Sequence, residues 1–153
     1  MDRLGPRYKV FVINLRRATD RLANISKILS GLNISFERIE AADAQNLSES
    51  EINKYYSKQL NKRLMTRYMS KAEIACYISH IYCWQKIVED RLDFAITIED
   101  DAIPNANLCK VIDFLKNYNG DFGYLQLGYR KSGRQDKAKT IRTCNGFEFV
   151  EYK

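Results

Sequence analysis

Three adjacent acids, Glu99, Asp100 and Asp101, stand directly after the apolar run of residues 94–98. An extended chain sends successive side chains to opposite sides, so Glu99 and Asp101 should face one way and Asp100 the other. Like charges packed together need a cation between them, and Mg²⁺ and Mn²⁺ both prefer oxygen ligands. The pattern predicts a divalent metal site, although a solvated acidic turn or a helix N-cap cluster explains the local sequence equally well.

A second group of residues has the spacing of metal ligands. Cys76, His80 and Cys83 recur at i, i+4 and i+7, which puts all three on one face of a helix and resembles part of a zinc site. One helix rarely brings three ligands onto a single metal, however, and buried cysteines are common in cores. We therefore interpret these residues as core, with His80 as a hydrogen-bonded core histidine, and all four cysteines as reduced thiols.

Strands and helices that alternate along the chain must position these side chains. We predict strands at residues 8–15, 34–39, 94–98 and 122–127, with a final strand or hairpin arm at 145–152. We predict helices at residues 19–32, 49–56, 70–90 and 105–118, and a loop at 58–68. This order indicates one α/β domain over residues 1–153, with a mostly parallel sheet flanked by helices. In such a sheet, ligands bind outside the carboxyl ends of the strands, which is where the three acids fall.

Capping signals mark two helix starts. Ser70 and Glu73 have the spacing of a capping box, and Thr19 or Asp20 can cap the first helix. Behind Ser70, apolar and aromatic residues recur at helical spacing, and we interpret them as core: Ile74, Tyr77, Ile78, Ile81, Trp84 and Val88.

Charge and composition exclude several classes of protein. A net charge of +6 suits an anionic substrate or an anionic membrane surface, but it is not the dense basic stripe of a nucleic-acid binder. No apolar run reaches the roughly 20 residues of a membrane span, and residues 1–6 lack the apolar segment of a signal peptide. We expect a cytoplasmic protein that binds no nucleic acid, and we leave open peripheral contact with the anionic inner membrane.

Four blocks of sequence stand in a recognisable order over roughly the first 105 residues: VINLRRATDRL (12–22), FERIEAADA (36–44), MSKAEIACYISHIYCWQKIVED (69–90) and FAITIEDDA (94–102). Together they resemble glycosyltransferase family 25, which includes the lipooligosaccharide galactosyltransferases and, more distantly, the collagen galactosyltransferases. The last block resembles the acidic motif of the family, its version of DxD. The family usually has glycine where this chain has Ala72 and Ala75, and the resemblance fades after about Leu127.

The resemblance implies a GT-A-like, Rossmann-type fold, a nucleotide-sugar donor and a divalent metal, Mn²⁺ or Mg²⁺. It makes Asp101 the direct metal ligand, and it gives Glu99 or Asp100 the ribose or a metal-bound water, with Glu99 as the second candidate metal ligand. The other donor-binding positions that it implies are Asn14, Arg16, Arg21, Asp43, Lys71 and Glu73.

These donor-binding positions have different implied roles. Asn14 and Arg16 would lie beside the base and ribose, and Asp43 would bond the uridine. Arg21 could face a phosphate or a structural acid. The helix start that holds Lys71 and Glu73 suits an anion, although the capping box alone explains Glu73 equally well. No catalytic base is assigned.

The activity that follows is metal-assisted transfer of a hexose, galactose in the first instance, from a UDP-sugar to a lipooligosaccharide or other surface glycan. Members of the family commonly run well beyond this chain, so a C-terminally truncated, non-catalytic remnant that binds a nucleotide sugar or a partner is the alternative. A third alternative is another metal-dependent phosphoryl or nucleotidyl enzyme. The basic segment of residues 130–142 could cover the donor phosphates, meet lipid headgroups or remain a solvated loop.

Overall fold

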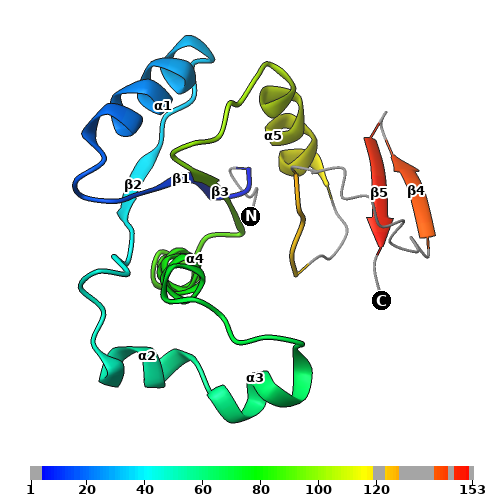
Figure 1. Cartoon of the computed structure of the whole chain (residues 1–153). Helices are drawn as coiled ribbons and strands as arrows, with labels where there is room; N and C mark the ends of the chain where they lie inside the picture. Colours follow the sequence, from blue (N-terminus) through cyan, green and yellow to red (C-terminus); the bar gives the residue numbers. More distant parts are fainter. Residues whose placement is uncertain (1–4, 119–122, 128–139, 145–146, 152–153) are drawn as a thin grey trace. The chain divides into compact units, whose positions relative to one another are not determined.

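The computed structural model describes residues 5–118, 123–127, 140–144 and 147–151, and the chain divides into two compact units, residues 1–110 and 111–153. The first unit is an α/β fold on a sheet of three parallel strands (Figure 1). Its elements are β1 Tyr8–Asn14, α1 Thr19–Gly31, β2 Glu37–Glu40, α2 Glu49–Tyr55, α3 Lys58–Leu64, α4 Lys71–Glu89 and β3 Phe94–Glu99. The α/β class and the parallel sheet are therefore confirmed.

β1 is the central strand of the sheet, whose strand order is β2-β1-β3. Its residues from Val10 to Asn14 are all buried, as an unbroken apolar run predicts for a strand covered on both faces. α1 and α4 lie on opposite sides of this sheet (Figure 1). Ile13 pairs with Ile39 on one side and with Glu99 on the other, so all three strands end at one edge.

The buried face of α4 differs from the predicted stripe. Tyr77, Trp84 and Val88 are 42%, 43% and 76% exposed, so their assignment to the core is wrong. The residues of α4 that are buried are instead Ile74, Ala75, Ile78, Ser79 and Cys83. Small side chains on this face allow the helix to approach the chain that follows β2, where the Ala42 amide donates to Ser79 Oγ at 3.0 Å.

The capping box at the start of α4 is confirmed, because Ser70 Oγ accepts from the Glu73 amide and the Glu73 carboxylate accepts from the Ser70 amide. The predicted cap of α1 is wrong. A tight turn, in which the Ala18 amide donates to the Leu15 carbonyl at 2.9 Å, places Ala18 at the N-cap position. Thr19 and Asp20 already lie inside the helix, where they cannot cap it.

Residues 58–64 form the helix α3, so the predicted loop at 58–68 is wrong for these residues. Ser57 caps this helix by accepting from the Leu60 amide, and Asn61 is buried where its side chain accepts from the Tyr56 hydroxyl at 2.8 Å. A local cap and a contact from outside the helix therefore stabilise a segment whose own apolar pattern is weak.

In the second unit, β4 Thr140–Cys144 and β5 Phe147–Glu151 pair antiparallel, which confirms a hairpin arm near the C-terminus. The helix α5 spans Asn107–Asn117 and begins in the first unit. The predicted strand at 122–127 is wrong for residues 123–127, none of which is in a strand and of which Tyr124 is 70% exposed. Most of the basic segment 130–142 lies outside the described residues. Among the described helices, none combines the length and the apolar character that crossing a bilayer requires.

Candidate functional site

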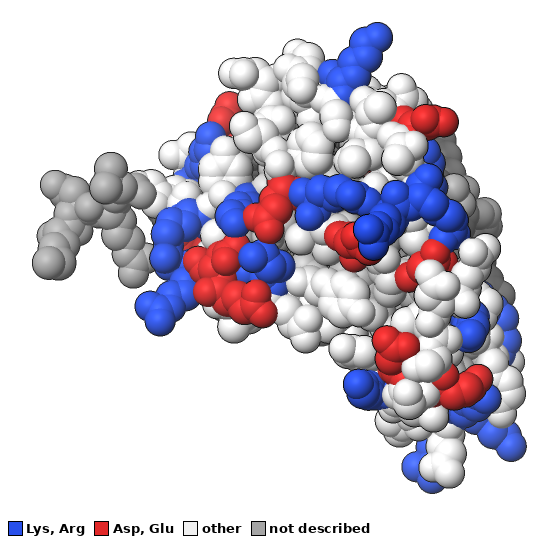
Figure 2. Space-filling view, turned by 90° about the vertical axis from the view of Figure 1, so that its left-hand side faces the viewer, with Lys and Arg blue, Asp and Glu red and all other residues white. Residues whose placement is uncertain are grey.

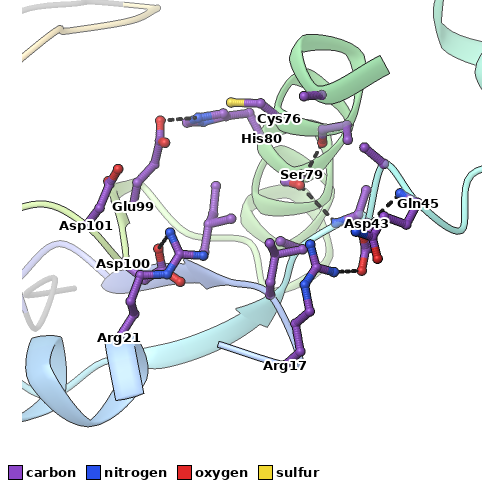
Figure 3. Close-up of a pocket in the computed structure, with 17 residues that line it drawn as sticks. Arg17, Arg21, Asp43, Gln45, Cys76, Ser79, His80, Glu99, Asp100 and Asp101 are labelled. Atoms are coloured by element: carbon purple, nitrogen blue, oxygen red, sulfur yellow. Dashed lines mark hydrogen bonds and ion pairs between the residues drawn. The ribbon is translucent and has the colours of Figure 1, made fainter. Parts of the chain in front are cut away.

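A cavity of about 340 Å³ opens at the carboxyl edge of the sheet in the first unit (Figure 3). The ends of β1 and β3, the chain after β2, the start of α1 and one face of α4 line it. The volume lies in the lower part of the range of small-molecule pockets, and the position is where α/β sheets bind ligands.

The three acids divide as an extended chain predicts. Glu99 and Asp101 are exposed at the mouth of the cavity, whereas Asp100 is 8% exposed and turns the other way (Figure 3). Asn14 Nδ2 donates to Asp100 Oδ2 at 2.6 Å, and Arg21 forms an ion pair with Asp100 Oδ1 at 3.1 Å. Asp100 is therefore fixed by β1 and α1, and two of the three carboxylates remain available at the mouth.

A second ion pair joins two side chains that line the cavity, those of Arg17 and Asp43. Asp43 also accepts from the amide of Gln45 at 3.0 Å, which fixes the turn after β2. The sequence prediction included Asp43 and missed Arg17. Two arginines in a row follow β1, and which of them turns toward the cavity depends on the turn that precedes α1.

His80 faces the acids from α4, so its prediction as a core histidine is wrong. Its side chain is 28% exposed, lines the cavity and lies with Nε2 3.6 Å from Glu99 Oε1. Cys76, one turn earlier, is exposed and also lines the cavity, so its assignment to the core is wrong, whereas Cys83 is fully buried as predicted. Partial burial raises the pKa of the Cys76 thiol, and the negative charges of Glu99 and Asp101 raise it further.

Of the predicted donor-binding residues, Arg21, Asp43, Glu99 and Asp100 line the cavity together with the predicted metal ligand Asp101. The remaining four do not line it: Asn14, Arg16, Lys71 and Glu73.

Each of three outlying side chains has a local partner. Asn14 holds Asp100, and Lys71 Nζ donates to the Leu47 carbonyl at 2.8 Å. The guanidinium of Arg67 and the capping bonds to Ser70 hold the pKa of Glu73 well below its usual range. The role of the outlying residues in donor binding stays a prediction.

The side chains at the mouth suit a divalent cation. Glu99 and Asp101 are exposed carboxylates on one side of the chain, and the ligand atoms of Glu99, His80 and Cys76 all lie within 4.8 Å of one another. In the described part of the chain, neither Glu99 nor Asp101 forms an ion pair with a lysine or arginine. Unneutralised carboxylates beside an imidazole offer a bound cation both charge and lone pairs.

Comparison of the amino-acid sequence with known proteins identifies a family. The sequence profile of glycosyltransferase family 25, described as LPS biosynthesis protein, matches residues 7–149. Procollagen galactosyltransferase 2 of Homo sapiens is 24% identical over 156 residues, which cover 94% of this chain and 24% of that protein. Lipooligosaccharide biosynthesis protein lic2B of Haemophilus influenzae is 31% identical over 102 residues, which cover 67% of this chain and 36% of that protein.

A third relative, from Rattus norvegicus, is named probable inactive glycosyltransferase 25 family member 3. It is 30% identical over 115 residues, which cover 70% of this chain and 19% of that protein. The chain thus spans between 19% and 36% of the length of these three relatives. Because the family profile extends over nearly the whole sequence, the chain belongs to glycosyltransferase family 25.

Proposed function

We propose that this chain provides the donor site of a glycosyltransferase that moves a hexose, galactose in the first instance, from a UDP-sugar to a lipooligosaccharide or other surface glycan. The observation that supports this most is the acidic pair Glu99 and Asp101 at the mouth of a cavity that also presents Arg17 and Arg21. The names of the relatives, a procollagen galactosyltransferase and a lipooligosaccharide biosynthesis protein, support the sugar and the kind of acceptor.

The distribution of charge around the cavity suits a nucleoside diphosphate with a divalent cation. Arg17 and Arg21 are 52% and 47% exposed in their side chains, so each can turn from its carboxylate partner toward a phosphate. Glu99 and Asp101, which also line the cavity, would hold Mn²⁺ or Mg²⁺. The bound cation would neutralise the negative charge that develops on the departing diphosphate.

The other cavity residues would bind and orient the donor. Asp43 can accept hydrogen bonds from the donor nucleoside, because its carboxylate faces the cavity beside Gln45. Asp100 would hold Arg21 beside the cavity until a phosphate binds. In the reaction, an acceptor hydroxyl replaces the diphosphate at the anomeric carbon and loses its proton. On this proposal the protein works in the cytoplasm, with peripheral contact at the inner membrane where a glycolipid acceptor lies.

The decisive experiment is a panel of UDP-sugars with and without Mn²⁺, read by calorimetry for binding and by product analysis for transfer. Asp101→Ala should weaken Mn²⁺-dependent UDP binding by at least roughly 100-fold, since even outer-shell partners of a metal are worth about 10- to 100-fold in affinity. The fold should survive, because the Asp101 side chain is exposed.

The matched control is Asp113→Ala, which removes an aspartate whose side chain is 75% exposed and lies 3.6 Å from the Lys116 ammonium. This variant should bind UDP and Mn²⁺ like the wild type. Unchanged affinity in Asp101→Ala, or an equal loss in Asp113→Ala, would show that the metal ligand has been assigned wrongly. A preference for ATP or a phosphate ester over all UDP-sugars would favour a phosphoryl or nucleotidyl enzyme instead.

A second candidate is donor binding without turnover. The match to a rat protein that is named probable inactive favours it, as does the small share of each relative that this chain spans. Thermal stabilisation by UDP with Mn²⁺, together with neither transfer nor donor hydrolysis in the panel, would support this candidate over the enzyme.

A further inference from the structure

We propose that Cys76, His80 and Glu99 form a binding site for a thiolate-preferring divalent metal of the Zn²⁺ class at the mouth of the cavity. This site goes beyond the proposed donor site, because neither the thiol nor the imidazole is needed to bind a nucleotide with Mn²⁺ or Mg²⁺. It also differs from the zinc site that the sequence spacing suggests, since Glu99 takes the place of Cys83.

Helical spacing and the end of one strand bring the three side chains together. Cys76 and His80 lie four residues apart on α4, so they stand one above the other on the same face. Glu99, the last residue of β3, reaches toward His80 from the sheet (Figure 3). Cys83 is one turn further along α4, but it is fully buried in a cluster with Phe11 and cannot join them.

The distances are close to those of an assembled metal site. Tetrahedral zinc with bonds of about 2.0–2.3 Å separates its ligand atoms by about 3.3–3.8 Å. His80 Nε2 and Glu99 Oε1 already lie 3.6 Å apart, and the Cys76 sulfur lies within 4.8 Å of one ring nitrogen of His80 and one carboxylate oxygen of Glu99. A small rotation of the exposed Cys76 side chain would complete the set without moving the backbone.

Access and ligand chemistry both favour this class of ion. Cys76 and Glu99 are exposed and His80 is partly exposed, so an ion can enter from solvent without opening the core. A thiolate and an imidazole prefer Zn²⁺ or Co²⁺, whereas Mg²⁺ and Ca²⁺ prefer oxygen ligands alone. The thiol gives up its proton when the metal binds, and three protein ligands leave one position for water or a bound molecule.

The test is a titration of the metal-free full-length chain with Co²⁺ as a spectroscopic substitute for Zn²⁺. One equivalent of Co²⁺ should produce a thiolate-to-cobalt charge-transfer band, and Zn²⁺ should abolish it by displacement. A large excess of Mg²⁺ should leave the band unchanged. If the folded wild-type chain gives no such band, the site does not exist.

Variants then assign the ligands. Cys76→Ser should remove the band, and His80→Gln and Glu99→Gln should each weaken Co²⁺ binding by about tenfold or more. Cys109→Ser is the matched control, because Cys109 is partly buried elsewhere with its sulfur 3.7 Å from the Leu32 carbonyl oxygen. A band that survives in Cys76→Ser, or that disappears in Cys109→Ser, would overturn the proposal.

A second measurement needs no variant. Zn²⁺ should slow alkylation of Cys76 in the wild-type chain by at least about tenfold and leave Cys109 unaffected, as read by mass spectrometry of peptides. Equal protection of both thiols, or none, would count against the site. All these experiments are done without nucleotide, so they do not depend on whether UDP binds. Asp101→Ala should keep the cobalt band even if it no longer binds UDP. Failure of the proposed donor site can therefore be distinguished from failure of this metal site.

Discussion

The neighbouring carboxylates of the acidic motif, Glu99, Asp100 and Asp101, differ in burial and in their partners. Asp100 is buried and serves structure, because it joins the end of β1 to the first turn of α1 through Asn14 and Arg21. Glu99 and Asp101 are exposed and free of lysine or arginine partners in the described part of the chain. A motif that looks uniform in sequence therefore combines one structural carboxylate with two that form the candidate metal site.

Asp100→Asn should lower the free energy of unfolding by about 1–3 kcal/mol, the usual cost of leaving a buried polar partner unsatisfied. The new amide keeps one acceptor oxygen, so its NH₂ group must face either Asn14 Nδ2 or Arg21, both of which are donors, and Arg21 would lose its ion pair. Urea denaturation followed by circular dichroism measures the change.

The matched substitution Asp101→Asn makes the same chemical change on an exposed residue. It should alter the free energy of unfolding by no more than about 0.5 kcal/mol. Equal losses in the two variants would mean that Asp100 has no special structural role.

At the scale of helices and strands, sequence patterns predict the elements whose determinants are local. The apolar run of β1 and the capping box of Ser70 and Glu73 predict a strand and a helix start, and both are confirmed. α3 is not predicted because its apolar pattern is weak, and only the Ser57 cap and the contact of Asn61 with Tyr56 mark it as a helix.

The same limit applies to the candidate site. Glu99 ends β3 and the Asp100 amide still bonds to β1, so the opposite directions of these two side chains can be read from sequence, whereas Asp101 lies in the turn that follows. The positions of Arg17 and His80 cannot be read from sequence, because they depend on the turn before α1 and on how α4 is rotated against the sheet. Aromatic side chains such as Trp84 suggest the wrong buried face, while small residues such as Ser79 determine the real one.

The start of α4 should give the protein a measurable acid sensitivity. The bond to Arg67 and the capping bonds to Ser70 lower the pKa of Glu73 in the folded chain below its ordinary value of 4.5. A lowered folded pKa means that this stabilisation is complete above about pH 4.5 and is lost as the pH falls toward the folded value. Glu73→Gln should therefore unfold with a shallower loss of stability between neutral and strongly acid pH.

Thermal unfolding from pH 6 downward measures that slope. Glu89→Gln removes the same charge from the last residue of α4 without touching Ser70 or Arg67, and so controls for net charge. If the two variants lose stability along identical curves, the capping box is not the source of the sensitivity.

For the molecule as a whole, the surplus of basic residues does not form one basic surface on the face in view. Figure 2 shows lysine and arginine side chains interspersed with aspartate and glutamate over the described part of that face. Ion pairs such as Lys9 with Glu37 and Asp90 contribute to this mixing. The mixed surface suits local recognition of a small anion at the cavity better than broad electrostatic attraction.

All the residues that line the cavity lie between positions 13 and 101, within the first compact unit. A chain shortened to residues 1–118 should therefore keep Mn²⁺-dependent UDP binding within about threefold of the full-length value, or about 0.7 kcal/mol. Calorimetry on both chains tests this, with circular dichroism to verify folding. Loss of binding in a folded short chain would mean that residues after 118 contribute to the donor site.

The register between β1 and β3 makes the motif sensitive to the number of residues as well as to their kind. Ile13 pairs with Glu99, and the next amide, that of Asp100, donates to the Ile13 carbonyl at 3.1 Å. One residue inserted between Ile98 and Glu99 would exchange inward and outward acids, whereas two would restore their directions. The site therefore depends on whether the number of residues added to this strand is odd or even, and not only on which side chains the strand carries.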